Sequence, residues 1–154
     1  MIKFRNLKPA DWDRVHELTK AAQVEDTSGI VCYDDEKPEH IKAVAVFDNW
    51  TFTSVQIHVA VVDKWVMRQG FVEEVFNFLF NTAGRKMVFG LTPSNNEVAL
   101  KFNEHIGFET VMVMEDAYDV GIDYVVTRLL KSNCKWINHG KEEHSGAARL
   151  RSRS

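Results

Sequence analysis

A strand that runs directly into a short amphipathic helix constrains the fold of this chain more than any other feature. The apolar run 87–91 has the composition of a buried strand, and a polar crossing at 92–94 follows it. Between Asn96 and Gly107 the apolar residues recur at helical spacing, and glycine suits the position where a helix ends. The apolar positions of this helix are Val98, Ala99, Phe102 and Ile106. A strand and a helix in this order predict a layered α/β domain.

Patterns along the rest of the chain predict further elements of both kinds. We expect strands at about 2–5, 30–33, 43–47, 52–62, 109–114 and 123–130, besides the one at 87–91. We expect helices at about 9–23 and 71–83, besides the one that begins near Asn96. The charged segment 34–40 reads as a turn between two strands. The predicted fold class is therefore α/β, with a mixed central sheet of six to seven strands flanked by helices.

The chain has room for one sizeable core. Its 154 residues are too few for two ordinary domains. From Asn138 onward there are four basic residues against two acidic ones and almost no apolar side chains, so this segment cannot build a core. We predict one domain at 1–137 and a polar, basic C-terminal tail at 138–154.

The composition argues against several classes of function. The net charge of −3 at pH 7 predicts no general affinity for nucleic acid. No apolar run approaches the ~20 residues that span a bilayer, and no secretory leader opens the chain, so we expect no membrane association and a cytoplasmic location. Cys32 and Cys134 lack the spacing of a zinc site, and we expect no metal and two inert, partly buried thiols.

The helix that begins at Asn96 resembles the second cofactor-binding motif of the GNAT acyltransferases. That motif runs Asn, two residues, Ala, two residues, a bulky apolar residue, usually Tyr, three residues and Gly-Phe. This chain agrees from Asn96 to Phe108 except that Asn103 stands in the position of Tyr. The resemblance implies the GNAT fold, acetyl-CoA as a co-substrate, and cofactor contacts from Asn96 and Phe102. Simple N-capping of the helix, by Ser94 or Asn95, is the alternative role for this helix start.

The family's phosphate loop is partly matched by residues 67–74. It usually reads Gln or Arg, two residues, Gly, one residue and Gly or Ala, because backbone N–H groups at a helix start hold the pyrophosphate. Gly70 takes the first glycine position, whereas Met67 and Val72 replace the other two. The resemblance implies cofactor binding by Arg68, Gln69, Gly70 and Phe71. An ordinary helix cap that binds nothing is the alternative, because the two glutamates that follow would repel a phosphate.

Acetyl transfer to an amine needs a base for the ammonium proton and donors for the developing oxyanion. The resemblance implies that the donors are backbone N–H groups near Val59 and Val61. His58, in the same strand, is our candidate base, because imidazole exchanges protons near neutral pH. A half-exposed strand histidine without a catalytic role is the alternative, and Asp63 and Glu36 are further candidate bases.

The acid that protonates the departing thiolate is the clearest departure from the family. Asn103 cannot give up a proton near neutral pH. Tyr118 and Tyr124 are the remaining candidates in the sequence, although strand tyrosines usually pack and form hydrogen bonds.

Two functions of different classes follow. The first is an N-acetyltransferase that moves acetyl from acetyl-CoA to a primary amine, on a small molecule or a protein, that the sequence does not identify. The second is a GNAT-fold protein that has lost catalysis and serves as a bacteriophage virion or assembly component. The chain is similar to short phage-encoded GNAT-like proteins, which likewise carry a Trp and an Arg in the phosphate loop, here Trp65 and Arg68. The tail 138–154 would then contact phage structural proteins. The oligomeric state stays open, since Phe76 and Phe80 fit either a core or an interface.

Overall fold

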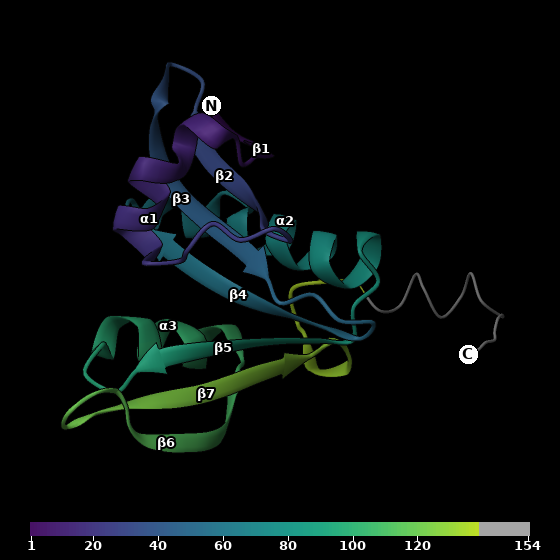
Figure 1. Ribbon diagram of the computed structural model, residues 1–154. Coiled ribbons are helices and arrows are strands. Elements are labelled where there is room, and N and C mark those ends of the chain that lie inside the picture. The colour runs from purple at the N-terminus through teal and green to yellow at the C-terminus, as the bar shows by residue number, and fades with distance from the viewer. Residues whose placement is uncertain (139–154) are drawn as a thin grey trace, which may run out of the picture.

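The computed structural model describes residues 1–138 and builds them on one seven-stranded sheet (Figure 1). The strand order is β1-β2-β3-β4-β5-β7-β6, and β4 and β5 are the parallel neighbours. The strands are β1 (Ile2–Asn6), β2 (Ser28–Asp34), β3 (Lys37–Asp48), β4 (Ser54–Val61), β5 (Met87–Pro93), β6 (Glu109–Asp119) and β7 (Ile122–Leu130). The predicted mixed sheet of six to seven strands is confirmed. Of the predicted tail at 138–154, all but Asn138 lies outside the described residues, so the domain boundary stays a prediction.

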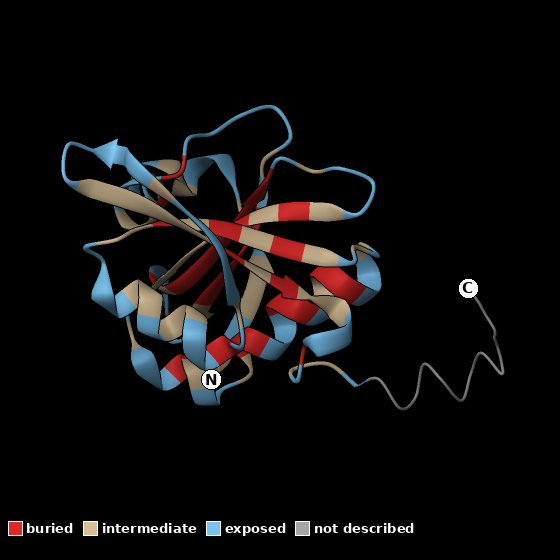
Figure 2. Ribbon diagram, turned by 90° about the horizontal axis from the view of Figure 1, so that it is seen from below, coloured by how far each residue is buried: buried red, intermediate tan, exposed pale blue. Residues whose placement is uncertain are grey.

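The core forms on both faces of the sheet, as the residue patterns require. Figure 2 shows the buried residues gathered on the central strands and on helices beside them. The larger cluster contains Phe47 and Leu79, and the smaller one contains Val15 and Val44. Phe76 and Phe80 are 3% and 0% exposed, so they belong to the core of this chain. Burial of each such ring stabilises the fold by about 1.5–3 kcal/mol.

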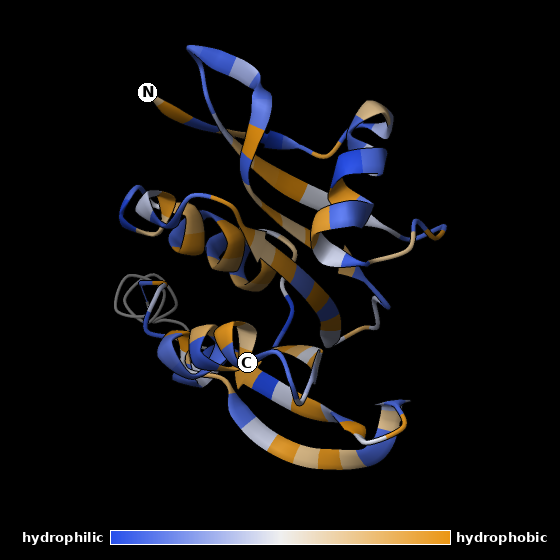
Figure 3. Cartoon of the chain, turned by 90° about the vertical axis from the view of Figure 1, so that its left-hand side faces the viewer, coloured by the Kyte–Doolittle hydropathy of each residue, from blue (hydrophilic) through white to orange (hydrophobic). Residues whose placement is uncertain are grey.

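Among the described residues, helices cover both faces of the sheet. They are α1 (Trp12–Thr19), α2 (Phe71–Phe76), which continues directly into the π-helix η3 (Asn77–Thr82), and α3 (Glu97–Ile106). Short 3-10 turns occupy η1 (Pro9–Asp11), η2 (Lys64–Arg68) and η4 (Lys131–Asn133). The side view in Figure 3 places α1 on one face and α2 and α3 on the other. No helix within residues 1–138 is long and apolar enough to cross a membrane.

The first helix ends earlier than its apolar spacing predicts. We expected it to continue to about Gln23, but it ends at Thr19, and Lys20 adopts a positive φ of 62°. The Thr19 hydroxyl donates to the Val15 carbonyl oxygen at 2.8 Å and accepts from the Ala21 amide at 3.1 Å. These bonds compete with further helical turns, and Ala21, beyond the end of the helix, is 3% exposed.

The turn within the charged segment 34–40 is also shorter than we predicted. β3 begins at Lys37, so the turn of the hairpin is confined to Asp35 and Glu36. Residues 37–40 are exposed, and backbone pairing with β2 at the hairpin end holds them in the strand without apolar side chains.

Strands β4 and β5 pair only at their beginnings. The register joins Ser54 to Met87, Val55 to Val88 and Gln56 to Phe89, and no further pair follows. Figure 1 shows the two strands diverging beyond that point, towards the left of the view. Backbone groups on the facing edges of β4 and β5 are therefore released from the sheet at this place.

Candidate active site between strands β4 and β5

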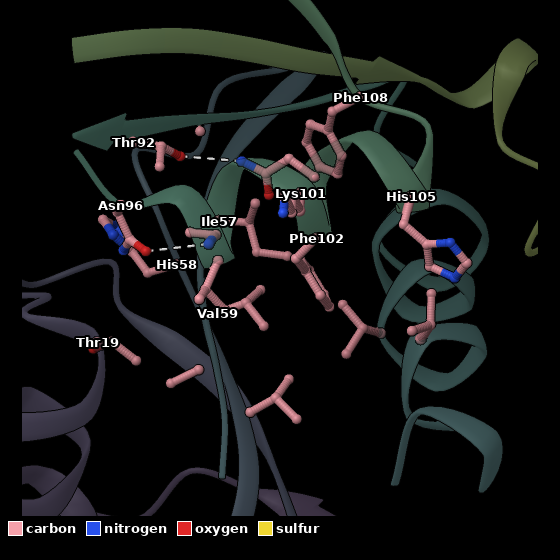
Figure 4. Close-up of a pocket in the computed structure, with 18 of the residues that line it drawn as sticks. Thr19, Ile57, His58, Val59, Thr92, Asn96, Lys101, Phe102, His105 and Phe108 are labelled. Atoms are coloured by element: carbon pink, nitrogen blue, oxygen red, sulfur yellow. Dashed lines mark hydrogen bonds between the residues drawn. The ribbon is translucent and has the colours of Figure 1, made fainter. Parts of the chain in front are cut away.

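A cleft of about 960 Å³ occupies the place where β4 and β5 diverge. It is lined from both faces of the sheet, by Leu18 and Thr19 of α1 on one side and by Phe71 of α2 and Phe102 of α3 on the other. Figure 4 shows Thr19 approaching from the α1 side, with Phe102 and Phe108 on the α3 side. The cleft thus reaches through the sheet, from one helical layer to the other.

Backbone groups of β4 point into this cleft. A Cβ atom on Gly90 of β5 would lie 3.4 Å from the Ile57 carbonyl oxygen, so the Ile57 backbone faces β5. Backbone groups two residues apart in a strand point the same way, which directs those of Val59 and Val61 to the β5 side as well. Because pairing ended at Gln56, these groups face the cleft instead of a neighbouring strand.

The turn before α2 provides a second set of backbone donors. Gly70 begins the helix with a φ of 91°, and the Glu74 amide donates to the Gly70 carbonyl oxygen at 2.9 Å. The amides of residues 71–73 precede this bond and have no partner in the preceding turn of the helix. Val72, in the position of a small residue in the family loop, is 2% exposed. Its side chain packs in the larger core cluster and also borders the cleft.

The charged residues near this turn point outward. Glu73 and Glu74 are exposed, so their carboxylates can extend into water. The Arg68 guanidinium lies 6.0 Å from the centre of the Trp65 ring, and both side chains are exposed. A cation–π contact of this kind holds Arg68 beside the helix start.

His58 is bound by a carboxylate from the neighbouring strand. Its Nε2 lies 3.1 and 2.9 Å from the two carboxylate oxygens of Asp48, the last residue of β3. The side chains of Asp48 and His58 are 10% and 23% exposed, and His58 lines the cleft. Along β4 it alternates with Ile57 and Val59, which pack in the cluster beneath α2 and α3. His58 therefore faces the α1 side of the sheet.

Helix α3 is tied to the cleft by two asparagines. The Asn96 side chain accepts a hydrogen bond from the Ala99 amide at 3.1 Å, so Asn96 is the N-cap and not Ser94 or Asn95, as the capping alternative had it. Asn103, in the position of the family's Tyr, donates to the Thr92 hydroxyl at 3.1 Å. Thr127 borders the same region, and its buried hydroxyl has no hydrogen-bond partner among the described residues.

The other candidate bases and acids lie outside the cleft. Asp63 caps η2 and accepts a hydrogen bond from the Lys42 ammonium at 2.9 Å, which lowers the pKa of its carboxyl. Glu36 is in the β2–β3 turn. Tyr118 and Tyr124 contact each other edge to face, with ring centres 5.4 Å apart, on the β6–β7 hairpin. Within residues 1–138, no three His, Cys, Asp or Glu side chains converge as metal ligands do.

Most of the predicted site residues meet at the cleft. Its lining includes His58, Val59, Val61, Phe71, Asn96 and Phe102. Arg68, Gln69 and Gly70 do not line it and form the turn just before Phe71. Among the ionisable residues of the site, sequence reasoning missed Asp48, which contacts His58, and the lining residues Arg14, Lys64, Lys101 and His105. The register of β3 on β4 places Asp48 beside His58. The packing of the helices and of the η2 turn brings the basic side chains to the cleft.

A mixed seven-stranded sheet that divides between two parallel strands, each followed by a helix, is the fold of the GNAT N-acetyltransferases, and this chain has that fold. It is similar to spermidine/spermine N-acetyltransferase SpeG from Vibrio cholerae in complex with manganese ions, with a TM-score of 0.70 at 12% identity, over 85% of this chain and 93% of that one. It is also similar to the ribosomal-protein-S18-alanine N-acetyltransferase from Escherichia coli, with a TM-score of 0.62 at 17% identity, over 84% and 94% of the two chains. No protein-family model and no curated protein matches the sequence.

Proposed function

We propose that this protein is an N-acetyltransferase that transfers acetyl from acetyl-CoA to a primary amine. The divergence of β4 and β5 carries the proposal, because it opens a cleft between two helical layers and turns backbone groups of Val59 and Val61 into it. The names of the two solved acetyltransferases support an amine as the acceptor.

Residues of this chain fit the parts of acetyl-CoA, which supplies the acetyl group as a thioester. The free amides after Gly70 and the Arg68 guanidinium suit the pyrophosphate, since a helix start favours an anion. The absence of a side chain at Gly70 allows that close approach. Along the cleft, Phe102 and the edge of β4 offer an apolar wall with backbone hydrogen-bonding groups, which suits the pantetheine arm. Asn96 shapes the end of this wall by capping α3.

The chemistry is assigned to two sets of groups. His58 takes the proton of the acceptor ammonium, and Asp48 holds the imidazole ring and stabilises its charge. The amine nitrogen then bonds to the thioester carbonyl carbon while Val59 and Val61 N–H groups stabilise the negative charge on its oxygen. The carbon–sulfur bond breaks and the nitrogen loses its second proton to solvent, which gives the amide. The thiolate takes up a proton from solvent, because Asn103 cannot supply one.

Thermal unfolding with and without millimolar acetyl-CoA tests the proposal. A ligand that binds only the folded state stabilises it by about 2.7 kcal/mol at a hundredfold excess over Kd. Gly70→Glu should abolish this shift. Gly84→Glu is the matched control, because Gly84 also has a positive φ (70°) and open space at its Cβ, beyond the other end of the same helix. The proposal would be contradicted if acetyl-CoA did not raise the unfolding temperature of the unchanged protein. It would also be contradicted if both variants lost that increase equally.

The second candidate is a GNAT-fold protein without turnover. It is favoured by Asn103, whose amide is engaged by Thr92 where the family has a tyrosine hydroxyl. A role in a bacteriophage virion, contacts through the tail 138–154, an oligomer and a cytoplasmic location all stay predictions. Release of CoA in the presence of any amine, abolished by His58→Gln, would exclude this candidate.

A further inference from the structure

The charged side chains that line the cleft are all basic. Arg14 of α1, Lys64 of η2 and Lys101 of α3 project to it, together with His58 and His105. Within the described part of the chain, no Asp or Glu lines it. Three carboxylates that contact or neighbour lining residues are engaged by a basic side chain, Asp63 by Lys42, Asp48 by His58 and Glu17 by Arg14. The cleft therefore favours anionic groups over cationic ones.

The three cations belong to different sides of the site. Lys64 follows β4 at the start of η2, and Lys101 lies on α3, so both belong with the elements proposed to hold the cofactor. Arg14 lies on α1, which packs on the opposite face of the sheet, the face towards which His58 points. The elements proposed to hold the cofactor thus carry the first two cations, whereas Arg14 lies on the opposite side of the sheet.

Arg14 is available to a ligand at little cost. Its guanidinium donates to Glu17 one turn along α1, and the two side chains are 50% and 65% exposed. An exposed pair at this spacing contributes only about 0.3–0.5 kcal/mol. A carboxylate of a ligand in the cleft can form a charge-assisted hydrogen bond with the same guanidinium.

We infer that the acceptor is an amine that also carries an anionic group, such as an aminocarboxylate, with Arg14 binding the anion while His58 faces the amine. The inference rests on the proposed function and narrows its substrate class. A polyamine would bring a second ammonium into a cleft that has several cations and no free carboxylate, and burial of that charge without a partner is unfavourable.

The test compares each amine with a partner that lacks only the negative charge. L-alanine, L-serine and L-glutamate are paired with their α-carboxamides, and spermidine is the cationic probe. Turnover is followed by release of CoA, and binding by calorimetry on protein saturated with CoA. We expect the amino acids to be preferred over their amides. Arg14→Gln should weaken binding of the preferred amino acid about tenfold and leave binding of its amide unchanged. Glu17→Gln is the matched control and should leave the preference intact or strengthen it.

Three results would overturn the inference. They are a preference for spermidine or the amides, an equal effect of Arg14→Gln on acid and amide, and no response to any amino acid although acetyl-CoA stabilises the protein. Failure of acetyl-CoA itself to stabilise the protein is a separate result, which removes the proposed function and this inference with it. Arg14 and Glu17 are exposed surface residues, so neither variant is expected to change stability by more than about 0.5 kcal/mol.

Discussion

Both carboxylate oxygens of Asp48 lie within hydrogen-bond distance of His58 Nε2, at 3.1 and 2.9 Å. A carboxylate only accepts hydrogen bonds, so the neutral ring must donate through Nε2 and keep Nδ1 free to accept a proton. No hydrogen bond within residues 1–138 involves that nitrogen. Asp48 thus selects the tautomer as well as the orientation of the ring.

The first prediction concerns this pair. Asp48→Asn should lower kcat about tenfold or more, because the ring loses its fixed tautomer and the partner of its positive charge. Binding of acetyl-CoA should be unchanged, since Asp48 does not line the cleft. Nitrogen-15 NMR of His58 should show the Nε2–H form in the unchanged protein and a mixture of tautomers in the variant. Asp35→Asn, in the β2–β3 turn, is the control. An unchanged tautomer and rate would show that Asp48 has only a packing role.

The second prediction concerns the hydroxyls beneath α3. Thr92→Val should destabilise the fold by about 1–2 kcal/mol, because it leaves the Asn103 amide without its acceptor. Thr127→Val removes a hydroxyl that has no partner among the described residues, so this variant should be neutral or more stable. Urea unfolding of the two variants measures the difference. Equal decreases in the free energy of unfolding would mean that the Thr127 hydroxyl is hydrogen-bonded to a water molecule.

The third prediction follows from the ion pair that joins β1 to the first helical turn. Arg5 binds both Asp11 oxygens at 2.7 and 2.8 Å, and this lowers the pKa of the Asp11 carboxyl. The stabilisation is complete above the pKa of the unfolded chain, about 4, and is lost as the pH falls through the lower pKa of the folded protein. Asp11→Asn should therefore unfold at lower temperature at pH 7, by an amount that shrinks below about pH 4. A difference that is constant with pH would contradict this reading.

The fourth prediction concerns the two thiols. Both are buried, and burial raises the pKa of Cys32 to about 12 and also raises that of Cys134. Ellman's reagent should therefore find no reactive thiol in the folded protein at pH 8 and both of them in guanidinium chloride. A fast reaction of either thiol in the folded protein would contradict this burial. If the prediction holds, the reagent can follow CoA release without background from the protein.

Much of the fold could be predicted from local patterns. A short apolar run predicts the strand at 87–91, and helical spacing of apolar residues predicts the helix after Asn96. A glycine at the end of that spacing predicts the helix end at Gly107. The structure contains all three. The end of the first helix could not be predicted, because hydrogen bonds of Thr19 override the apolar spacing that continues beyond it.

The candidate site was predicted in part for a similar reason. Val59, Val61 and Phe102 lie in segments whose position follows from the motif and the alternation of β4. Asp48 could not be recognised, since its contact with His58 depends on the register that pairs Val46 with His58 across two strands. Arg14 is hidden in the same way, because helical spacing shows that it is on a polar face but not that the face borders a cleft.

A cleft that passes through the sheet has a kinetic consequence for the proposed acetyl transfer. Acetyl-CoA can enter from the α2–α3 layer and the amine from the α1 layer. Both can then be bound at the same time when the acetyl group is transferred. No side chain then needs to carry the acetyl group between them, and the buried thiols of Cys32 and Cys134 are not placed to do so. Initial-rate lines at varied concentrations of both substrates should intersect, as they do when two reactants meet in a ternary complex, and should not run parallel.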